Sequence, residues 1–190
     1  MSEVELHAPF LGYSGAIGKI VYRKYKGRTI ACLKPSPKRT LSQAEINNRE
    51  RFKQAAAYGK LSLANPATRA LYEQAAKEKD VPVFSLCVAD FFNAPTVQSV
   101  DLSAYNGQVG DTIQIIAADD FGVVNVHLTL KIADGTLIES GNAIQDHVGT
   151  GHWNYNATAS VAFGTPVIAY VVATDRPGGT AVESMGTTIR

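Results

Sequence analysis

One alternating stretch decides the fold of the C-terminal half: Val124-Asn125-Val126-His127-Leu128-Thr129-Leu130-Lys131-Ile132. Successive side chains of a strand point to opposite faces of a sheet, so this alternation of apolar and polar residues predicts a half-buried β-strand. Residues 153–160 alternate in the same way. Residues 166–173 are apolar at almost every position, which is typical of a central strand.

Turn signals separate these strands from their neighbours. Asn106-Gly107, Asp134-Gly135, Gly149-Thr150-Gly151 and Pro177-Gly178-Gly179 are such signals. Further strands are expected over 96–104, 111–117, 137–140 and 180–189. About seven short strands in a stretch of this length predict an antiparallel β-sandwich.

The N-terminal half follows a different pattern, which begins with a β-hairpin. Its expected arms are 19–25 and 28–33, and Lys26-Gly27 lies between them. Glycine adopts the positive φ that a tight hairpin turn requires.

Helices follow the hairpin. Ser42 and Glu45 have the spacing of a capping box, which predicts a helix over 43–58 with Gly59 as its C-terminal cap. Asn65-Pro66 predicts the start of a second helix that continues to about residue 79. Pro82 starts a third, whose residues 84–92 form an apolar stripe.

The hydrophobic pattern changes from helical spacing to strand alternation near residue 95, and the distribution of charge divides the chain at the same place. Residues 1–95 contain 15 Lys and Arg and 8 Asp and Glu, a net charge of +7, whereas residues 96–190 contain 3 and 9, a net charge of −6. We therefore expect an α+β chain of two modules, with a basic hairpin-plus-helices module over 1–94 and an immunoglobulin-like β-sandwich over 95–190.

The most basic stretch predicts a contact with an anionic partner. Its residues are Lys19, Arg23, Lys24, Lys26, Arg28, Lys34, Lys38 and Arg39. The alternative is that the basic module docks on the acidic module of its own chain or of a neighbouring copy, because a field of charge does not name its partner.

Motifs for chemistry are weak in this sequence. Gly12, Gly15, Gly18 and Lys19 lack the spacing and the hydroxyl of a phosphate-binding loop. The histidines show no metal-ligand spacing, and Cys32 and Cys87 have no local base, so we expect no catalytic residue and no cofactor.

One group of acidic residues suggests calcium. The loops after residues 118 and 174 should emerge at the same end of a sandwich, which would bring Asp119, Asp120 and Asp175 together. Their oxygens suit Ca²⁺. The favoured alternative is that aspartate serves there as a turn residue.

No stretch reaches the ~18 apolar residues of a membrane span. The first residues, Met1-Ser2-Glu3-Val4-Glu5, have neither the basic nor the apolar region of a signal peptide. These features predict a protein that stays in the cytoplasm.

The N-terminal half resembles small uncharacterised bacterial and phage-encoded proteins with a glycine-rich basic hairpin and a helix pair. The motifs that carry the resemblance are Leu41-Ser42-Gln43-Ala44-Glu45, Leu61-Ser62, Pro66-Ala67-Thr68-Arg69 and the aromatic segment 84–92. Related helix pairs occur in phage structural proteins, so the resemblance implies a structural role and a location in the virion or the bacterial cytoplasm.

The C-terminal half resembles bacterial immunoglobulin-like domains. The resembling residues include Gly110-Asp111-Thr112, Trp153-Asn154-Tyr155 and the stretch from Ala173 to Gly179. Such sandwiches serve as spacers, adhesins and virion decorations.

Together these features predict a non-enzymatic structural or assembly protein. Its most concrete form is a phage virion component (a capsid, connector or tail-associated subunit) that binds other protein subunits as a homo-oligomer or within a larger assembly. The alternative is a nucleic-acid-binding protein that uses the basic hairpin at residues 19–39.

Overall fold

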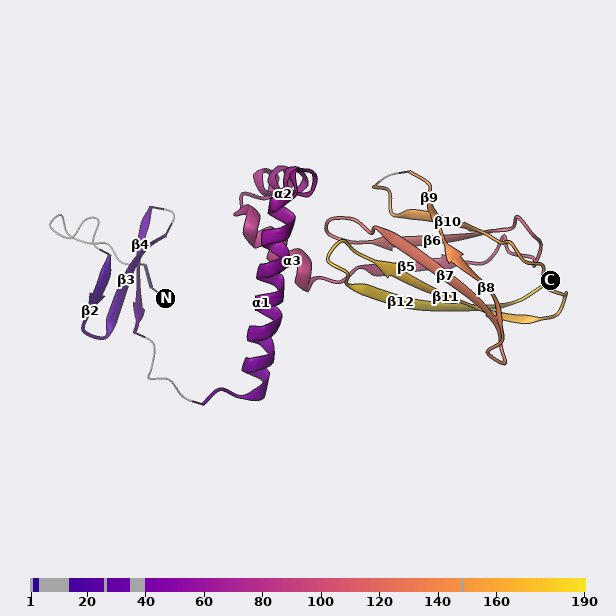
Figure 1. Ribbon diagram of the computed structural model, residues 1–190, viewed down its shortest axis with the longest axis horizontal. Helices are drawn as coiled ribbons and strands as arrows, with labels where there is room; N and C mark the ends of the chain where they lie inside the picture. The colour runs from indigo at the N-terminus through magenta and orange to yellow at the C-terminus, as the bar shows by residue number, and fades with distance from the viewer. Residues whose placement is uncertain (1, 4–13, 26, 35–39, 148) are drawn as a thin grey trace. The chain divides into compact units, whose positions relative to one another are not determined.

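A computed structural model describes residues 2–3, 14–25, 27–34, 40–147 and 149–190 (Figure 1). The chain divides into two compact units, Met1–Ile46 and Asn47–Arg190. This division differs from the expected boundary after residue 94. The helices group with the sandwich because Phe121, from a sandwich loop, packs into their apolar cluster.

The first unit contains a small antiparallel sheet that includes the two predicted hairpin arms and two further short strands. Its strands β1 (Ser2–Glu3), β2 (Gly15–Ile17), β3 (Ile20–Tyr25) and β4 (Arg28–Leu33) lie in the order β1-β4-β3-β2. Tyr25 pairs with Arg28 across the hairpin, and Gly27 has a φ of 78°. The other expected turn residue, Lys26, lies outside the described residues.

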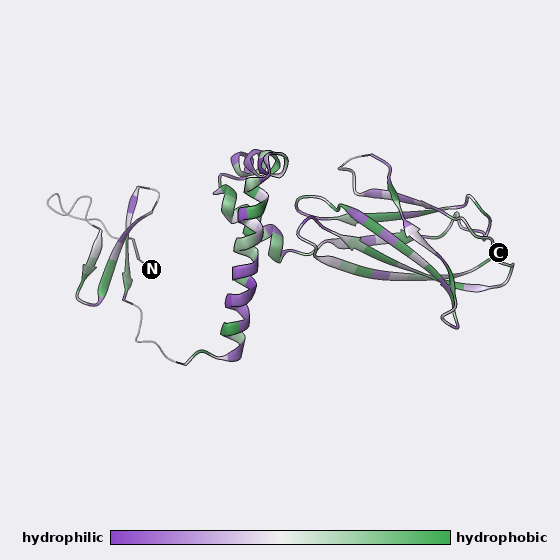
Figure 2. Cartoon of the chain, in the orientation of Figure 1, coloured by the Kyte–Doolittle hydropathy of each residue, from purple (hydrophilic) through white to green (hydrophobic). Residues whose placement is uncertain are grey.

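Helix α1 (Gln43–Ala64) begins at the predicted capping box. The Ser42 backbone N–H donates to Glu45 Oε2 at 2.9 Å, and the Glu45 N–H donates to Ser42 Oγ at 3.3 Å. Each side chain thus satisfies a backbone donor of the other residue. The helix is mostly hydrophilic in its first turns (Figure 2), and none of the residues from Gln43 to Gln54 is buried.

The prediction that Gly59 ends this helix is wrong, because α1 continues for more than another turn to Ala64. Gly59 is buried, and a Cβ there would lie 3.0 Å from the Phe84 ring and 3.4 Å from Cys87 Cβ. The glycine therefore lets α1 and α3 approach closely.

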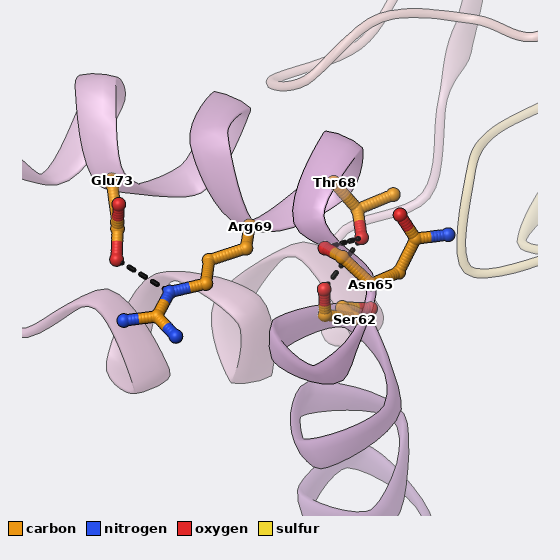
Figure 3. Close-up of polar contacts among 5 residues, drawn as sticks. All are labelled: Ser62, Asn65, Thr68, Arg69 and Glu73. Atoms are coloured by element: carbon orange, nitrogen blue, oxygen red, sulfur yellow. Dashed lines mark hydrogen bonds and ion pairs between the residues drawn. The ribbon is translucent and has the colours of Figure 1, made fainter.

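Helices α2 (Pro66–Lys79) and α3 (Val83–Phe92) agree with the sequence prediction. The Asn65 side chain accepts a hydrogen bond from the Ala67 N–H at 3.0 Å, as expected of an N-cap. At the corner between α1 and α2 the Thr68 hydroxyl donates to the Ser62 carbonyl (Figure 3). Arg69 Nε pairs with Glu73 Oε1 at 2.7 Å one turn along α2 (Figure 3).

The rest of the second unit is a β-sandwich made of two antiparallel sheets. One has the order β5-β6-β10-β9 and the other the order β12-β11-β7-β8. The strands are β5 (Thr96–Asp101), β6 (Thr112–Ala118), β7 (Asn125–Ile132), β8 (Leu137–Asn142), β9 (Ile144–Gln145), β10 (His152–Asn156), β11 (Pro166–Thr174) and β12 (Thr180–Thr188).

The apolar residues of the alternating patterns form the core of the sandwich. Val126, Leu128 and Leu130 of β7 are fully buried, and β11, expected to be central, lies between β12 and β7. Two expected strands end early, at Asp101 and Asn156. In the first case the Asp101 carboxylate accepts the Ser103 N–H and forms a turn. These contacts establish an α+β chain with a sandwich of antiparallel sheets.

Candidate interaction surface

The small sheet of the first unit has no core among its described residues. None of the residues 14–25 and 27–34 is buried, whereas β7 and β11 of the sandwich bury every second side chain. A sheet gains stability by covering at least one apolar face. The small sheet is therefore a surface that a partner can cover.

Strand register places three large apolar side chains in a row on one face of this sheet. Ile17 pairs directly with Ile20, and Ile20 pairs with Leu33. Directly paired residues of antiparallel strands project to the same face. The three side chains are 53%, 40% and 77% exposed. We call this side of the sheet the apolar-row face.

The opposite face carries cations around an aromatic ring. Tyr25 pairs directly with Arg28, and Arg23 lies two residues before Tyr25 on β3, so all three residues share a face. Tyr25 is 62% exposed, and both arginines are exposed. We call this side the arginine face.

The described residues among those predicted to bind an anion therefore lie on both faces of the small sheet. Arg23 and Arg28 lie on the arginine face, whereas Lys24 belongs to the apolar-row face because it lies between Arg23 and Tyr25 on the same strand. Lys19 precedes β3 and Lys34 follows β4, and the Lys34 N–H donates to the Lys19 carbonyl at 2.6 Å. The other predicted residues, Lys26, Lys38 and Arg39, lie outside the described residues.

Most acidic side chains of the sandwich have structural roles. Six of the nine acidic residues after residue 95 accept backbone N–H groups in turns or loops, as aspartate commonly does. The six are Asp101, Asp111, Asp119, Asp134, Glu139 and Asp175. The negative charge of this half thus comes largely from residues that hold its turns.

Each of the three calcium candidates accepts a hydrogen bond from the protein itself. Asp119 accepts the Phe121 N–H at 2.9 Å, Asp120 accepts from Asn93 Nδ2 at 2.6 Å, and buried Asp175 accepts the Gly178 N–H at 2.8 Å. Within the described part of the chain no group of three His, Cys, Asp or Glu residues is arranged to hold a metal ion. These contacts agree with the turn interpretation.

The charges of Asp119 and Asp175 instead affect a third carboxylate, that of Asp90, which the sequence analysis did not identify. Asp90 of α3 is fully buried, and its Oδ2 accepts hydrogen bonds from the hydroxyls of Tyr72 and, at 3.3 Å, Tyr58. Its Oδ1 has no hydrogen-bond partner. The sequence signal was a lone acid in the otherwise apolar segment 84–92.

Burial is the main cause that raises the pKa of Asp90, to about 6. The negative charges of Asp119 and Asp175 raise it further, while the tyrosine hydroxyls lower it by stabilising the carboxylate. Burial also raises the pKa of Asp175 and, most strongly, that of Tyr72. The site is therefore a buried, hydrogen-bonded carboxyl at the contact between helices and sandwich, where Tyr72 also packs on Phe121 with ring centroids 4.8 Å apart.

Comparison with known proteins gives a weak structural match and no sequence match. No family model and no curated protein matches the chain. Among solved structures, the chain is similar to CopC from Methylosinus trichosporium OB3b, with 13% sequence identity and a TM-score of 0.38. That match covers 50% of this chain and 91% of the other. None of the described helices is long and apolar enough to span a membrane.

Proposed function

We propose that this chain is a non-enzymatic assembly protein whose small sheet docks on another protein subunit. The observation that supports this proposal is the absence of any buried residue among residues 14–25 and 27–34. Strands whose described residues form no core of their own are stabilised when a partner covers them.

The apolar-row face is the side that a protein partner would cover. Fully burying a side chain the size of Ile or Leu stabilises a contact by roughly 1.5–3 kcal/mol. Ile17, Ile20 and Leu33 are large apolar side chains directly adjacent across three strands, so one partner surface can cover all of them.

Charge favours one way of packing two copies of the chain together over another. Residues 14–34 contain six Lys and Arg and no acid, and β1 adds one acid, Glu3, so two such sheets packed on each other would bring an excess of positive charge together. The net charge of −6 over residues 96–190 favours a contact between the sheet of one copy and the acidic half of the next. This is a heterologous contact, which builds rings or filaments.

Such an assembly agrees with a virion subunit, as the resemblance of the N-terminal half implies. It also agrees with an immunoglobulin-like sandwich that acts as a rigid spacer between contacts. In this proposal the sandwich contributes shape and a docking surface, and the chain carries out no chemical reaction.

Sedimentation velocity over a wide range of protein concentration tests the proposal. The wild-type chain should form species heavier than its 20.3 kDa monomer as concentration rises. Ile17→Thr, Ile20→Thr and Leu33→Thr together should leave a monomer with an unchanged circular dichroism spectrum. Leu61→Thr, at an exposed residue of α1 that lies outside both the small sheet and residues 96–190, is the matched control and should still associate. A wild type that stays monomeric at every concentration, or a control that dissociates equally, would overturn the proposal.

A further inference from the structure

We propose that a cleft between α2 and the sandwich binds an aliphatic carboxylic acid, with the carboxylate on Arg176 and the hydrocarbon chain against apolar walls. The cleft has a volume of about 390 Å³. Sites for small molecules in proteins have volumes of this order. The inference goes beyond the assembly role, because no residue of the small sheet lines the cleft.

The cleft brings together segments that lie far apart in the sequence. Its walls include Leu71 and Ala75 of α2, Phe121 and Val123 of the loop after β6, Gln145 of β9 and Arg176 of the loop after β11. Four of these side chains are apolar, and that of Leu71 is 49% exposed. An apolar wall that is open to water gains stability when a hydrocarbon chain covers it.

Arg176 is the cation of this cleft, and its guanidinium group has no partner in the described part of the chain. The side chain is half-buried, yet it forms no hydrogen bond, ion pair or ring contact with any described residue. A charged group that is partly removed from water is costly unless an opposite charge pairs with it. The guanidinium group therefore favours an anion, and a carboxylate matches it with two parallel N–H···O bonds.

Buried or half-buried carboxylates hold the two loops that carry Arg176 and Phe121. Asp175 is 2% exposed and accepts the Gly178 N–H at 2.8 Å, which fixes the turn after β11. Asp119 accepts the Phe121 N–H at 2.9 Å, which fixes the loop after β6. Both loops are thus ordered before a ligand arrives, and a preformed site loses less conformational entropy on binding.

Gln145 supplies a second polar group that no described side chain occupies. It is half-buried, and its amide forms no hydrogen bond with any described residue. Its backbone is fixed because it pairs directly with Trp153 of β10. The amide N–H groups of glutamine can donate to a carboxylate oxygen, which accepts more than one hydrogen bond.

The surrounding charge favours a ligand with a single negative charge. Glu78 also lines the cleft, and residues 96–190 carry a net charge of −6. These charges repel an anion of charge two or more, such as a phosphate, more strongly than they repel a monocarboxylate.

A hydrocarbon chain suits the cleft better than a peptide. A peptide would bring N–H and C=O groups that need hydrogen-bond partners once they leave water. The exposed polar side chains that α2 presents to the cleft are already bonded to each other, with Gln74 Nε2 3.3 Å from Glu78 Oε1. A hydrocarbon chain needs no such partners.

Isothermal titration calorimetry of the full chain with octanoate and with octanamide tests the proposal. The two probes have the same hydrocarbon chain and differ in the charge of the head group. Octanoate should bind about 10- to 150-fold more tightly, the factor expected of hydrogen bonds between charged groups. Arg176→Gln should lower the affinity for octanoate by that factor and leave octanamide unchanged. Arg176→Lys should retain part of the difference, since lysine keeps the charge without the planar group.

Lys131→Gln is the matched control, because it removes the same charge from β7 at a residue that does not line the cleft. Octanoate binding should be unchanged in this variant. Leu71→Ala should weaken both probes by the same factor, about 4-fold for each methylene contact that is lost. The combined Ile17, Ile20 and Leu33 variant should bind octanoate as the wild type does, which separates this site from the assembly role.

Four outcomes would overturn the proposal. They are no octanoate binding at millimolar concentration, equal affinities for octanoate and octanamide, equal losses for Lys131→Gln and Arg176→Gln, and tighter binding of an apolar peptide with a free C-terminal carboxylate than of octanoate. The last result would assign the cleft to the end of a protein chain. None of the four bears on the assembly role, which sedimentation velocity tests with different variants.

Discussion

The Tyr72 hydroxyl of α2 donates a hydrogen bond to the Asp90 carboxylate of α3, and both residues are fully buried. Tyr58 of α1 reaches the same two groups, with its hydroxyl 2.7 Å from that of Tyr72. One carboxyl therefore connects all three helices. A buried carboxylate is costly unless it is paired, and no cation is present among its described hydrogen-bond partners.

Asp90→Asn should stabilise the protein at neutral pH. The pKa of Asp90 is about 6 in the folded chain, above its ordinary 3.8, so its contribution to stability is fully present below pH 3.8 and is lost as pH rises through 6. This loss amounts to about 3 kcal/mol above pH 7. Asparagine keeps an acceptor for Tyr72 and does not ionise. Urea unfolding should therefore give a free energy of unfolding that is higher for the variant than for the wild type at pH 7.5 but not at pH 4.

Asp101→Asn is the control for that measurement. The exposed Asp101 accepts the Ser103 N–H, which lowers its pKa, so its contribution is present at neutral pH and lost as pH falls. The two variants should show pH dependences of opposite sign. Identical pH profiles for Asp90→Asn and the wild type would contradict the buried-carboxyl interpretation.

Tyr72→Phe should destabilise the protein by about 1–3 kcal/mol, because it removes a hydrogen-bond donor from a buried carboxylate and keeps the ring against Phe121. Tyr58→Phe should cost less, since its hydroxyl lies farther from Asp90, at 3.3 Å, and is only partly buried. Thermal unfolding of both variants at pH 7.5 measures the difference. Equal effects would show that the closer bond is not the stronger one.

Gly59→Ala should destabilise the protein by about 1 kcal/mol, although alanine normally favours a helix over glycine by about that amount. The new methyl group would meet the Phe84 ring at 3.0 Å. Combining it with Phe84→Leu should remove the penalty, because leucine is smaller and more adaptable. A double-mutant cycle by urea unfolding checks this coupling, and additive effects would refute it.

Glu139→Ala should destabilise the sandwich by about 2 kcal/mol. The buried Glu139 carboxylate accepts the backbone N–H of Thr158 at 2.7 Å and that of Ala159 at 3.2 Å. These two residues follow the end of β10 at Asn156, where the strand was expected to continue to residue 160. Glu139→Gln keeps one acceptor and should cost less. Hydrogen exchange at Thr158 and Ala159 should accelerate in the alanine variant, and unchanged exchange would contradict this role.

Local signals in the sequence were sufficient for most helices and strands. The Ser42 and Glu45 pair, the Asn65 cap and the alternation along β7 each act within a few residues, where backbone donors, side-chain acceptors and side-chain direction are set by spacing alone. The same is true of the hairpin from Ile20 to Leu33.

The sequence by itself therefore determined the order and type of the helices and the longer strands, and which side of the alternating strands is apolar, but not the short strands β1, β2 and β9. The tertiary structure alone decided that α1 continues through Gly59, that the charges of Asp119 and Asp175 act on the pKa of Asp90, and that the helices group with the sandwich. It also separated the basic residues of the hairpin onto two faces through strand register. These features depend on residues far apart in the chain, because burial and close approach are properties of what packs against a residue and not of its neighbours in sequence.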